Sequence, residues 1–157
     1  MTTSLDLITA AAEIHHEDLR DRLVRHTQSV ITAVTAHWPY EPARQDLVDF
    51  LNDELLAHTE VEEGLVYTAG ENDRTALLVA AMLDEHRMMG ALVREIEQAT
   101  DGIDVALAAG ALVVLYDVCV HQENRYLLPA LADAGVNLTA LVEDVPEIVG
   151  TARAAAR

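Results

Sequence analysis

The chain has 157 residues, 51% of them hydrophobic and few of them Gly or Pro, which is enough for one domain with a buried core. Its formal net charge of −17, from 27 acidic and 10 basic residues, opposes binding to a nucleic-acid backbone or an anionic membrane, and we expect neither partner. One Trp, one Phe and four Tyr are few aromatics for a β-sandwich, whereas the many Ala and Leu residues favour α-helices.

The first predicted helix spans about residues 4–36. Its apolar residues recur at helical spacing, at Leu5, Ile8, Ala12, Leu19, Leu23, Val30 and Val34. The segment from Trp38 to Pro42, with two prolines, ends this helix. The N-terminal segment has neither a basic region nor an uninterrupted apolar stretch, so we expect a cytoplasmic protein.

The second predicted helix begins near Pro42, which suits a first helical turn, and continues to Tyr67. Its apolar positions are Leu47, Phe50, Leu51, Leu55 and Val61. The third predicted helix begins at Asp73, a candidate N-cap, and ends near Gly102. Its apolar positions are Leu77, Leu78, Met82, Met89, Leu92 and Ile96.

The fourth predicted helix covers about residues 104–134, and Pro129 stands where its last turns should kink or end. Its apolar positions include Leu112, Leu115, Leu127 and Leu131. The stretch 105–120 is the most apolar of the chain, but Asp117 and several small residues favour a buried bundle helix over a membrane span. Cys119 is the only cysteine, so no intrachain disulfide can form.

Four helices with short connections imply antiparallel neighbours. We therefore predict an all-α fold, an up-down-up-down four-helix bundle formed by about residues 4–134 of a single domain that spans residues 1–157. The C-terminal tail, residues 138–157, could add a short fifth helix that is interrupted at Pro146.

Each predicted helix carries side chains that can bind a metal near its middle. In chain order these are His15-His16, His58 with Glu62, Asp84-Glu85-His86, and His121-Gln-Glu123. Mid-helix residues of an antiparallel bundle fall at one level along its axis, so these side chains can converge on one interior point. His58 and Glu62, four residues apart, stand on one helix face and combine imidazole nitrogen with carboxylate oxygen, a mixture that suits iron.

These motifs resemble the hemerythrin-like (HHE cation-binding) domain family over about residues 10–134. The matching segments are His16-Glu-Asp-Leu19, His58-Thr-Glu-Val-Glu62-Glu63-Gly-Leu-Val-Tyr67, Glu85-His86-Arg87 and Glu123-Asn-Arg-Tyr-Leu-Leu-Pro129. The resemblance implies a centre of two iron ions with an oxo or hydroxo bridge. The metal ligands that it implies are His16, His58, Glu62, His86 and Glu123.

His16 rather than His15 is the expected ligand of the first helix. Adjacent residues of a helix point about 100° apart, so only one of the two can face the core. His16 shares its face with Leu19 and matches the family's His-x-x-Leu. His15 is expected to be a half-exposed neighbour or a hydrogen-bond donor to a ligand. His26 and His37 are predicted to be surface or helix-end residues.

The fourth helix departs from the family pattern. The family's remaining His is expected at position 119, where this chain has Cys119, and His121 is only two residues from Glu123, on nearly the opposite face. Three replacements are open: a phenolate from Tyr116, a thiolate from Cys119, or His121 turned inward by irregular backbone. We favour Tyr116, because a phenolate oxygen suits ferric iron and a buried thiol is commonly a small apolar group.

The third helix has Met82 one turn before His86, where oxygen-carrying hemerythrins have a second His. Fewer imidazoles and more oxygen donors stabilise Fe(III) and disfavour reversible O₂ transport. We therefore predict a protein that binds or reduces O₂ or peroxide in redox stress handling, with catalase-like turnover as its enzymatic form. The alternatives are a non-enzymatic sensor or store for O₂, NO or iron, and a bundle with a decayed metal site; the oligomeric state stays open.

Overall fold

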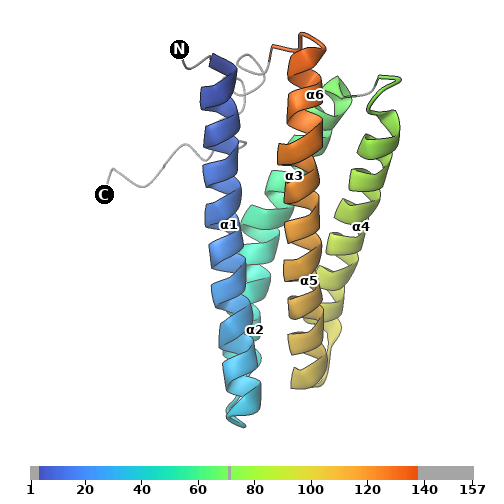
Figure 1. The fold of residues 1–157 in the computed structure, drawn as a ribbon. Coiled ribbons are helices and arrows are strands. Elements are labelled where there is room, and N and C mark those ends of the chain that lie inside the picture. Colours follow the sequence, from blue (N-terminus) through green and yellow to red (C-terminus); the bar gives the residue numbers. More distant parts are fainter. Residues whose placement is uncertain (1–3, 71, 138–157) are drawn as a thin grey trace.

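A computed structural model describes residues 4–70 and 72–137, with side chains from residue 10 onward. Its helices form four long rods (Figure 1). The first rod is α1 (Ser4–Thr35), and the third is α4 (Ala76–Gln98). The second joins α2 (Glu41–Phe50), the π-helical turn η1 (Leu51–Leu55), α3 (Leu56–Glu62) and the π-helical turn η2 (Glu63–Tyr67). The fourth joins α5 (Gly102–Gln122), the π-helical turn η3 (Glu123–Leu127) and α6 (Leu128–Asp133).

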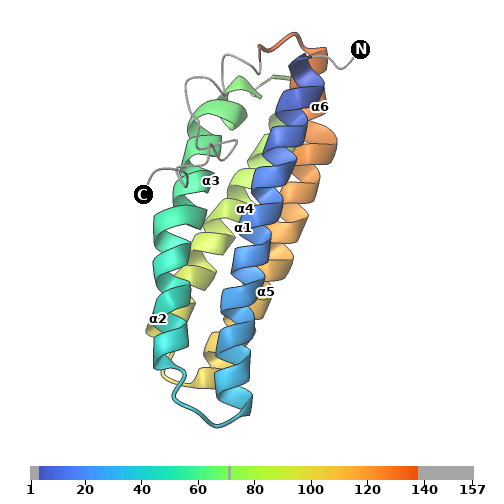
Figure 2. The same cartoon turned by 90° about the vertical axis from the view of Figure 1, so that its left-hand side faces the viewer.

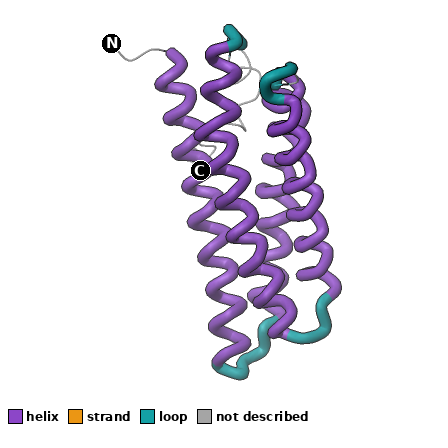
Figure 3. The backbone as a smooth tube through the Cα atoms, turned by 45° about the vertical axis from the view of Figure 1, so that its right-hand side comes forward, coloured by secondary structure: helices purple, strands orange, loops and turns teal. Residues whose placement is uncertain are grey.

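The rods form an antiparallel bundle. α1 packs against α2 and α5, and α4 packs against α5 and α2, so each rod contacts two others (Figures 1 and 2). The loops lie at the two ends of the bundle, and mid-rod residues therefore face each other (Figure 3). The predicted all-α bundle is confirmed for the part of the chain that the structure describes, and the predicted fifth helix at 138–157 falls outside that part.

One apolar core runs through the bundle. Its fully enclosed side chains include Leu19, Leu23, Leu47, Leu51, Leu55, Met82, Met89, Ile96, Leu112, Leu127 and Leu131. Burial of each such side chain contributes roughly 1.5–3 kcal/mol relative to exposure. Among the described residues, the fourth rod (Gly102–Asp133) is long and apolar enough for a membrane span by length and composition, a test that bundle-core helices also pass.

The ends of α1 and of α6 share one geometry. At α1, Trp38 N donates to Ala33 O (2.9 Å) and His37 N to Val34 O (3.2 Å), the Schellman pattern of helix ends. The left-handed residue of that pattern is His37, with φ 55°. At α6 the same position is occupied by Gly135, with φ 78°.

Replacing His37 by Gly should raise the free energy of unfolding by about 0.5–1 kcal/mol. A side chain at positive φ costs roughly 1–2 kcal/mol, and part of this gain is lost to the greater freedom of Gly in the unfolded chain. The imidazole of His37 is exposed, so little packing is lost. Urea unfolding measures this free energy. Gly135→Ala should lower it, because Gly135 holds the same position at the end of α6. An equal loss of stability in both variants would contradict the explanation.

The third rod begins later than the sequence predicts. The prediction that Asp73 is the N-cap of this helix is wrong, because α4 begins at Ala76 and Thr75 is its N-cap residue. The oxygen of the Asn72 side chain accepts a hydrogen bond from Arg74 N (3.0 Å), and this turn takes up the residues before the helix.

The fourth rod continues past Pro129 to Asp133, although the sequence predicts a kink or an end there. Proline lacks a main-chain donor, and in a regular α-helix its ring collides with the carbonyl four residues earlier. That carbonyl belongs to Arg125, inside η3. The wider π-helical turn accommodates the ring, so the rod carries Glu123 and the residues after it without interruption.

Candidate metal centre

Five polar side chains are buried together inside the bundle, each only 2–5% exposed: His16, His58, Glu62, His86 and Glu123. They come from all four rods: α1, α3, α4 and the start of η3. Burying so many imidazoles and carboxylates costs stability unless they bind one another or an ion. All five are the ligands that the family resemblance implies, and the structure brings them to one place.

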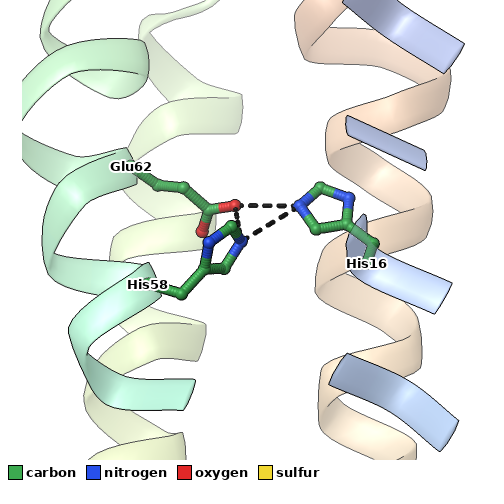
Figure 4. A group of neighbouring side chains, drawn as sticks. All are labelled: His16, His58 and Glu62. Carbon is green, nitrogen blue, oxygen red and sulfur yellow. Dashed lines mark hydrogen bonds and ion pairs between the residues drawn. The ribbon is translucent and has the colours of Figure 1, made fainter. Parts of the chain in front are cut away.

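The carboxylate of Glu62 lies at the centre of this cluster. Its Oε1 is 2.7 Å from His58 Nε2 and 3.1 Å from His16 Nε2, as Figure 4 shows. Its Oε2 is 3.7 Å from His86 Nε2. The two oxygens of one carboxylate thus face different imidazoles, an arrangement that can bridge two cations.

Glu123 closes the cluster from the fourth rod. Its Oε2 lies 3.6 Å from His16 Nε2, and its carboxyl group makes a hydrogen bond with Glu62. Burial and the neighbouring Glu62 raise the pKa of Glu123 well above its usual range. Burial alone would also raise the pKa of Glu62, but the imidazoles of His58 and His16 hold it well below that range. Of the two carboxyl groups, Glu123 therefore holds a proton more readily than Glu62.

Sequence reasoning missed Tyr67, which also belongs to the cluster. Its hydroxyl oxygen is 3.1 Å from His86 Nε2 and 3.8 Å from Cys119 Sγ, and its ring stacks on that of His86. Burial, reinforced by the negative charge of the Glu62 carboxylate, raises the pKa of the Tyr67 hydroxyl far above its ordinary value. The hydroxyl is therefore protonated in this state and needs a cation to become a phenolate.

The π-helical turn η2 explains how Tyr67 reaches the cluster. In a regular α-helix a residue five positions after Glu62 would point about 140° away from it. η2 begins directly after Glu62 and ends at Tyr67, and its wider turn brings this side chain back to the core, where it is 1% exposed. A regular helical projection does not reveal such a turn, so the spacing alone gave no sign of this residue.

The three side chains considered for the missing ligand lie in different places. Tyr116 is buried, and its hydroxyl donates a hydrogen bond to the main-chain oxygen of His16 (3.2 Å). Cys119 is buried beside Tyr67, and burial raises the pKa of its thiol far above the ordinary value. His121 is exposed, with its ring edge against Tyr126. The oxygen that the structure brings to His86 is that of Tyr67.

The other histidines are more exposed than the cluster residues, as predicted for His15 and His37, whereas His26 is neither fully at the surface nor at a helix end. His15 is half-buried beside the cluster, with its ring edge-on to that of His58 at 4.8 Å between centroids. Burial and the nearby imidazoles lower the pKa of His15 to about 4, so it stays neutral at pH 7. His26 is partly buried and stacks on Phe50, and His37 is exposed at the end of α1.

The donor set fits metal ions. The ligand atoms of His16, His58 and Glu62 all lie within 4.8 Å of one another, close enough to share one ion. The second oxygen of Glu62 faces His86, which has the Tyr67 oxygen beside it. Imidazole, carboxylate and phenol groups are donors that iron prefers, and a cation here would displace a proton from the carboxyl groups.

Glu63 holds the imidazole of His86 in place. Its Oε1 is 2.9 Å from His86 Nδ1, which leaves Nε2 directed at the cluster. A carboxylate on the far nitrogen of a ligating imidazole fixes its tautomer and strengthens it as a ligand. Glu63 itself is partly exposed, so it acts through His86 rather than as a ligand.

Glu63→Ala should weaken iron binding about 10–100-fold, the usual effect of losing such a partner. A competition titration against a chelator of known affinity measures this loss. Glu60→Ala is the matched control, because Glu60 is exposed on the same rod, outside the cluster. Equal affinities of the two variants would show that the contact between Glu63 and His86 does not support the site.

A groove of about 460 Å³ between α1 and the fourth rod reaches His16 from the surface. Arg20 and Asp117 line it and join its two sides through paired hydrogen bonds of 2.7 and 3.1 Å. Among the described residues, His16 Nδ1 and Asn124 Oδ1 are buried polar atoms without a partner, and both residues line this groove. Small polar molecules can therefore approach the cluster from this side.

Comparison with known proteins agrees with the geometry. A family model described as the hemerythrin HHE cation binding domain matches residues 7–131, well over half of the chain. Among curated proteins and solved structures, the same comparison found no match to the chain. The resemblance predicted from the sequence is thus confirmed, and all the cluster residues lie inside the matched range.

Proposed function

Because the chain belongs to the hemerythrin HHE cation-binding domain family, we propose that its buried cluster holds two iron ions and that the protein binds or reduces O₂ or hydrogen peroxide. The observation that carries this proposal is the Glu62 carboxylate, whose two oxygens face imidazoles from three different rods. A carboxylate in this position can give one oxygen to each of two ions, whereas a single ion would leave the imidazole on one side without a metal.

The residues divide between two positions. His16, His58 and Oε1 of Glu62 would hold one ion. His86, Tyr67 and Oε2 of Glu62 would hold the other. Glu123, which contacts His16 and Glu62, would give up its proton on binding and add a further oxygen ligand. An iron pair held here would accept two electrons from one molecule of peroxide and donate two electrons to another.

The donor set favours peroxide turnover over reversible transport of O₂. Three oxygen-donor residues, Glu62, Glu123 and Tyr67, stand beside three imidazoles here. A phenolate and carboxylates stabilise Fe(III). Met82, fully buried one turn before His86, offers no imidazole to offset this. Two molecules of hydrogen peroxide can then react without another reductant: one is oxidised to O₂ and the other is reduced to water, giving one O₂ and two H₂O.

The proposal is tested on purified protein loaded with iron under anaerobic conditions. We expect two iron ions per chain and O₂ release from added peroxide at half the rate of peroxide loss. The metal-free protein is the control and should release no O₂. Iron binding without O₂ release would favour a sensor or a store. Folded protein that takes up no iron would support the decayed-site alternative.

A further inference from the structure

The outer face of α5 carries an exposed apolar ridge. Its members are Ile103 (61% exposed), Leu107 (67%), Val114 (64%) and Val118 (43%), with the exposed Ala111 among them. At about 100° per residue, all five positions fall within a stripe roughly 100° wide. The opposite face of the same helix is buried in the core through Val105, Ala109, Leu112, Tyr116 and Cys119. We refer to the five exposed residues as the α5 ridge.

A helix that is apolar on every face is normally enclosed by protein on every side. α5 is enclosed by α1 and α4 only, so the α5 ridge is uncovered in the described part of the chain. The ridge itself contains no charged residue, although the chain has a net charge of −17. Contiguous apolar patches on an otherwise charged surface mark contact sites.

We propose that the α5 ridge binds the α5 ridge of a second copy of the chain, antiparallel and about a twofold axis. The four large side chains of the ridge are spaced symmetrically about the point between Gly110 and Ala111. Ile103 and Val118 are equally distant from that point, and so are Leu107 and Val114. In an antiparallel pair Ile103 of one copy therefore lies opposite Val118 of the other, and Leu107 lies opposite Val114.

This symmetry selects a second copy over an unrelated partner. A twofold contact uses the same patch on both chains, so the patch must be complementary to itself when its direction is reversed. At the centre, Gly110 and Ala111 are small, and two helices can approach closely there while the larger side chains interlock on either side.

The size and the charge of the surface determine how tight the pair is. The ridge is about 22 Å long at 1.5 Å per residue, and two helices about 10 Å wide cover a few hundred Å² of each other over that length. Stable complexes bury roughly 800 Å² per partner, so we expect a reversible dimer with a Kd in the micromolar range. Two acidic chains repel each other, and salt should therefore tighten the dimer.

Sedimentation equilibrium of the full chain between 1 and about 500 µM, at low and at high salt, tests the pairing. Wild-type protein should dimerise with concentration, and more tightly at high salt. Leu107→Glu should stay monomeric, because each chain would then place a negatively charged carboxylate in the apolar contact. Leu77→Glu is the matched control: Leu77 is 86% exposed on α4, outside the ridge, and its replacement should leave the dimer unchanged.

Cysteine cross-linking tests the direction of pairing. Under mild oxidation a Leu107→Cys chain should link to a Val114→Cys chain more readily than to its own copies. Helical content and iron uptake should match the wild type in every variant, since the ridge faces away from the metal centre. Wild-type protein that stays monomeric at all concentrations, or a dimer that survives Leu107→Glu, would overturn the proposal. Wild-type binding to phosphatidylcholine vesicles that Leu107→Glu abolishes would assign the ridge to lipid instead.

Discussion

Replacing Glu62 by Ala is expected to reduce the iron content of the purified protein from two ions per chain to almost none. Glu62 contacts imidazoles from three rods, so its loss removes an oxygen ligand from both ion positions at once. Loss of a partner that only supports a ligand already costs about 10–100-fold in affinity, and loss of a shared ligand should cost more than about 100-fold. Metal analysis by mass spectrometry measures the content.

The same variant should lose the stabilisation that iron provides. A ligand at 100 times its Kd adds about 2.7 kcal/mol to the free energy of unfolding, so wild-type protein should melt at a higher temperature with iron than without it. Glu62→Ala should melt at the same temperature with and without iron. Glu60→Ala changes a residue on the exposed side of α3, and it should be stabilised by iron like the wild type. An unchanged iron effect in Glu62→Ala would place the metal elsewhere.

The second large effect is expected from Tyr67→Phe, which should remove the visible absorption band of the ferric protein. A phenolate bound to Fe(III) absorbs visible light, and the Tyr67 oxygen is the phenol oxygen beside His86 Nε2. Tyr116→Phe is the matched control, because the Tyr116 hydroxyl already donates to the main chain of His16. Ferric Tyr67→Phe protein should have almost no visible absorption band, whereas ferric Tyr116→Phe protein should keep it.

Optical spectra and resonance Raman spectra with excitation in that band distinguish the two tyrosines. Loss of the band in Tyr116→Phe, with the band intact in Tyr67→Phe, would instead support the ligand that the sequence favours. A wild-type ferric protein with no such band would show that neither phenol binds iron.

The sequence predicts those parts of the site that lie in regular helix. His58 and Glu62 are four residues apart within α3, where the spacing of the α-helix holds, and they meet as expected. His16 rather than His15 faces the core for the same reason, since the helical phase set by Leu19 is undisturbed along α1.

The sequence predicts the site poorly where the backbone leaves the α-helix. η2 begins one residue after Glu62 and changes the direction of every side chain that follows, so a projection at 3.6 residues per turn misplaces Tyr67. η3 begins at Glu123, after His121, and therefore does not turn that imidazole inward. The contact between Tyr116 and the main chain of His16 depends on how α1 and α5 pack, which no local pattern encodes.

We propose that side chains from four rods hold two iron ions around Glu62. Anomalous diffraction from crystals of the iron-loaded protein, recorded on either side of the iron absorption edge, would locate these ions. We expect two anomalous peaks inside the bundle, one beside His16 and His58 and one beside His86, with Glu62 contacting both. A single peak, or peaks outside this cluster, would contradict it.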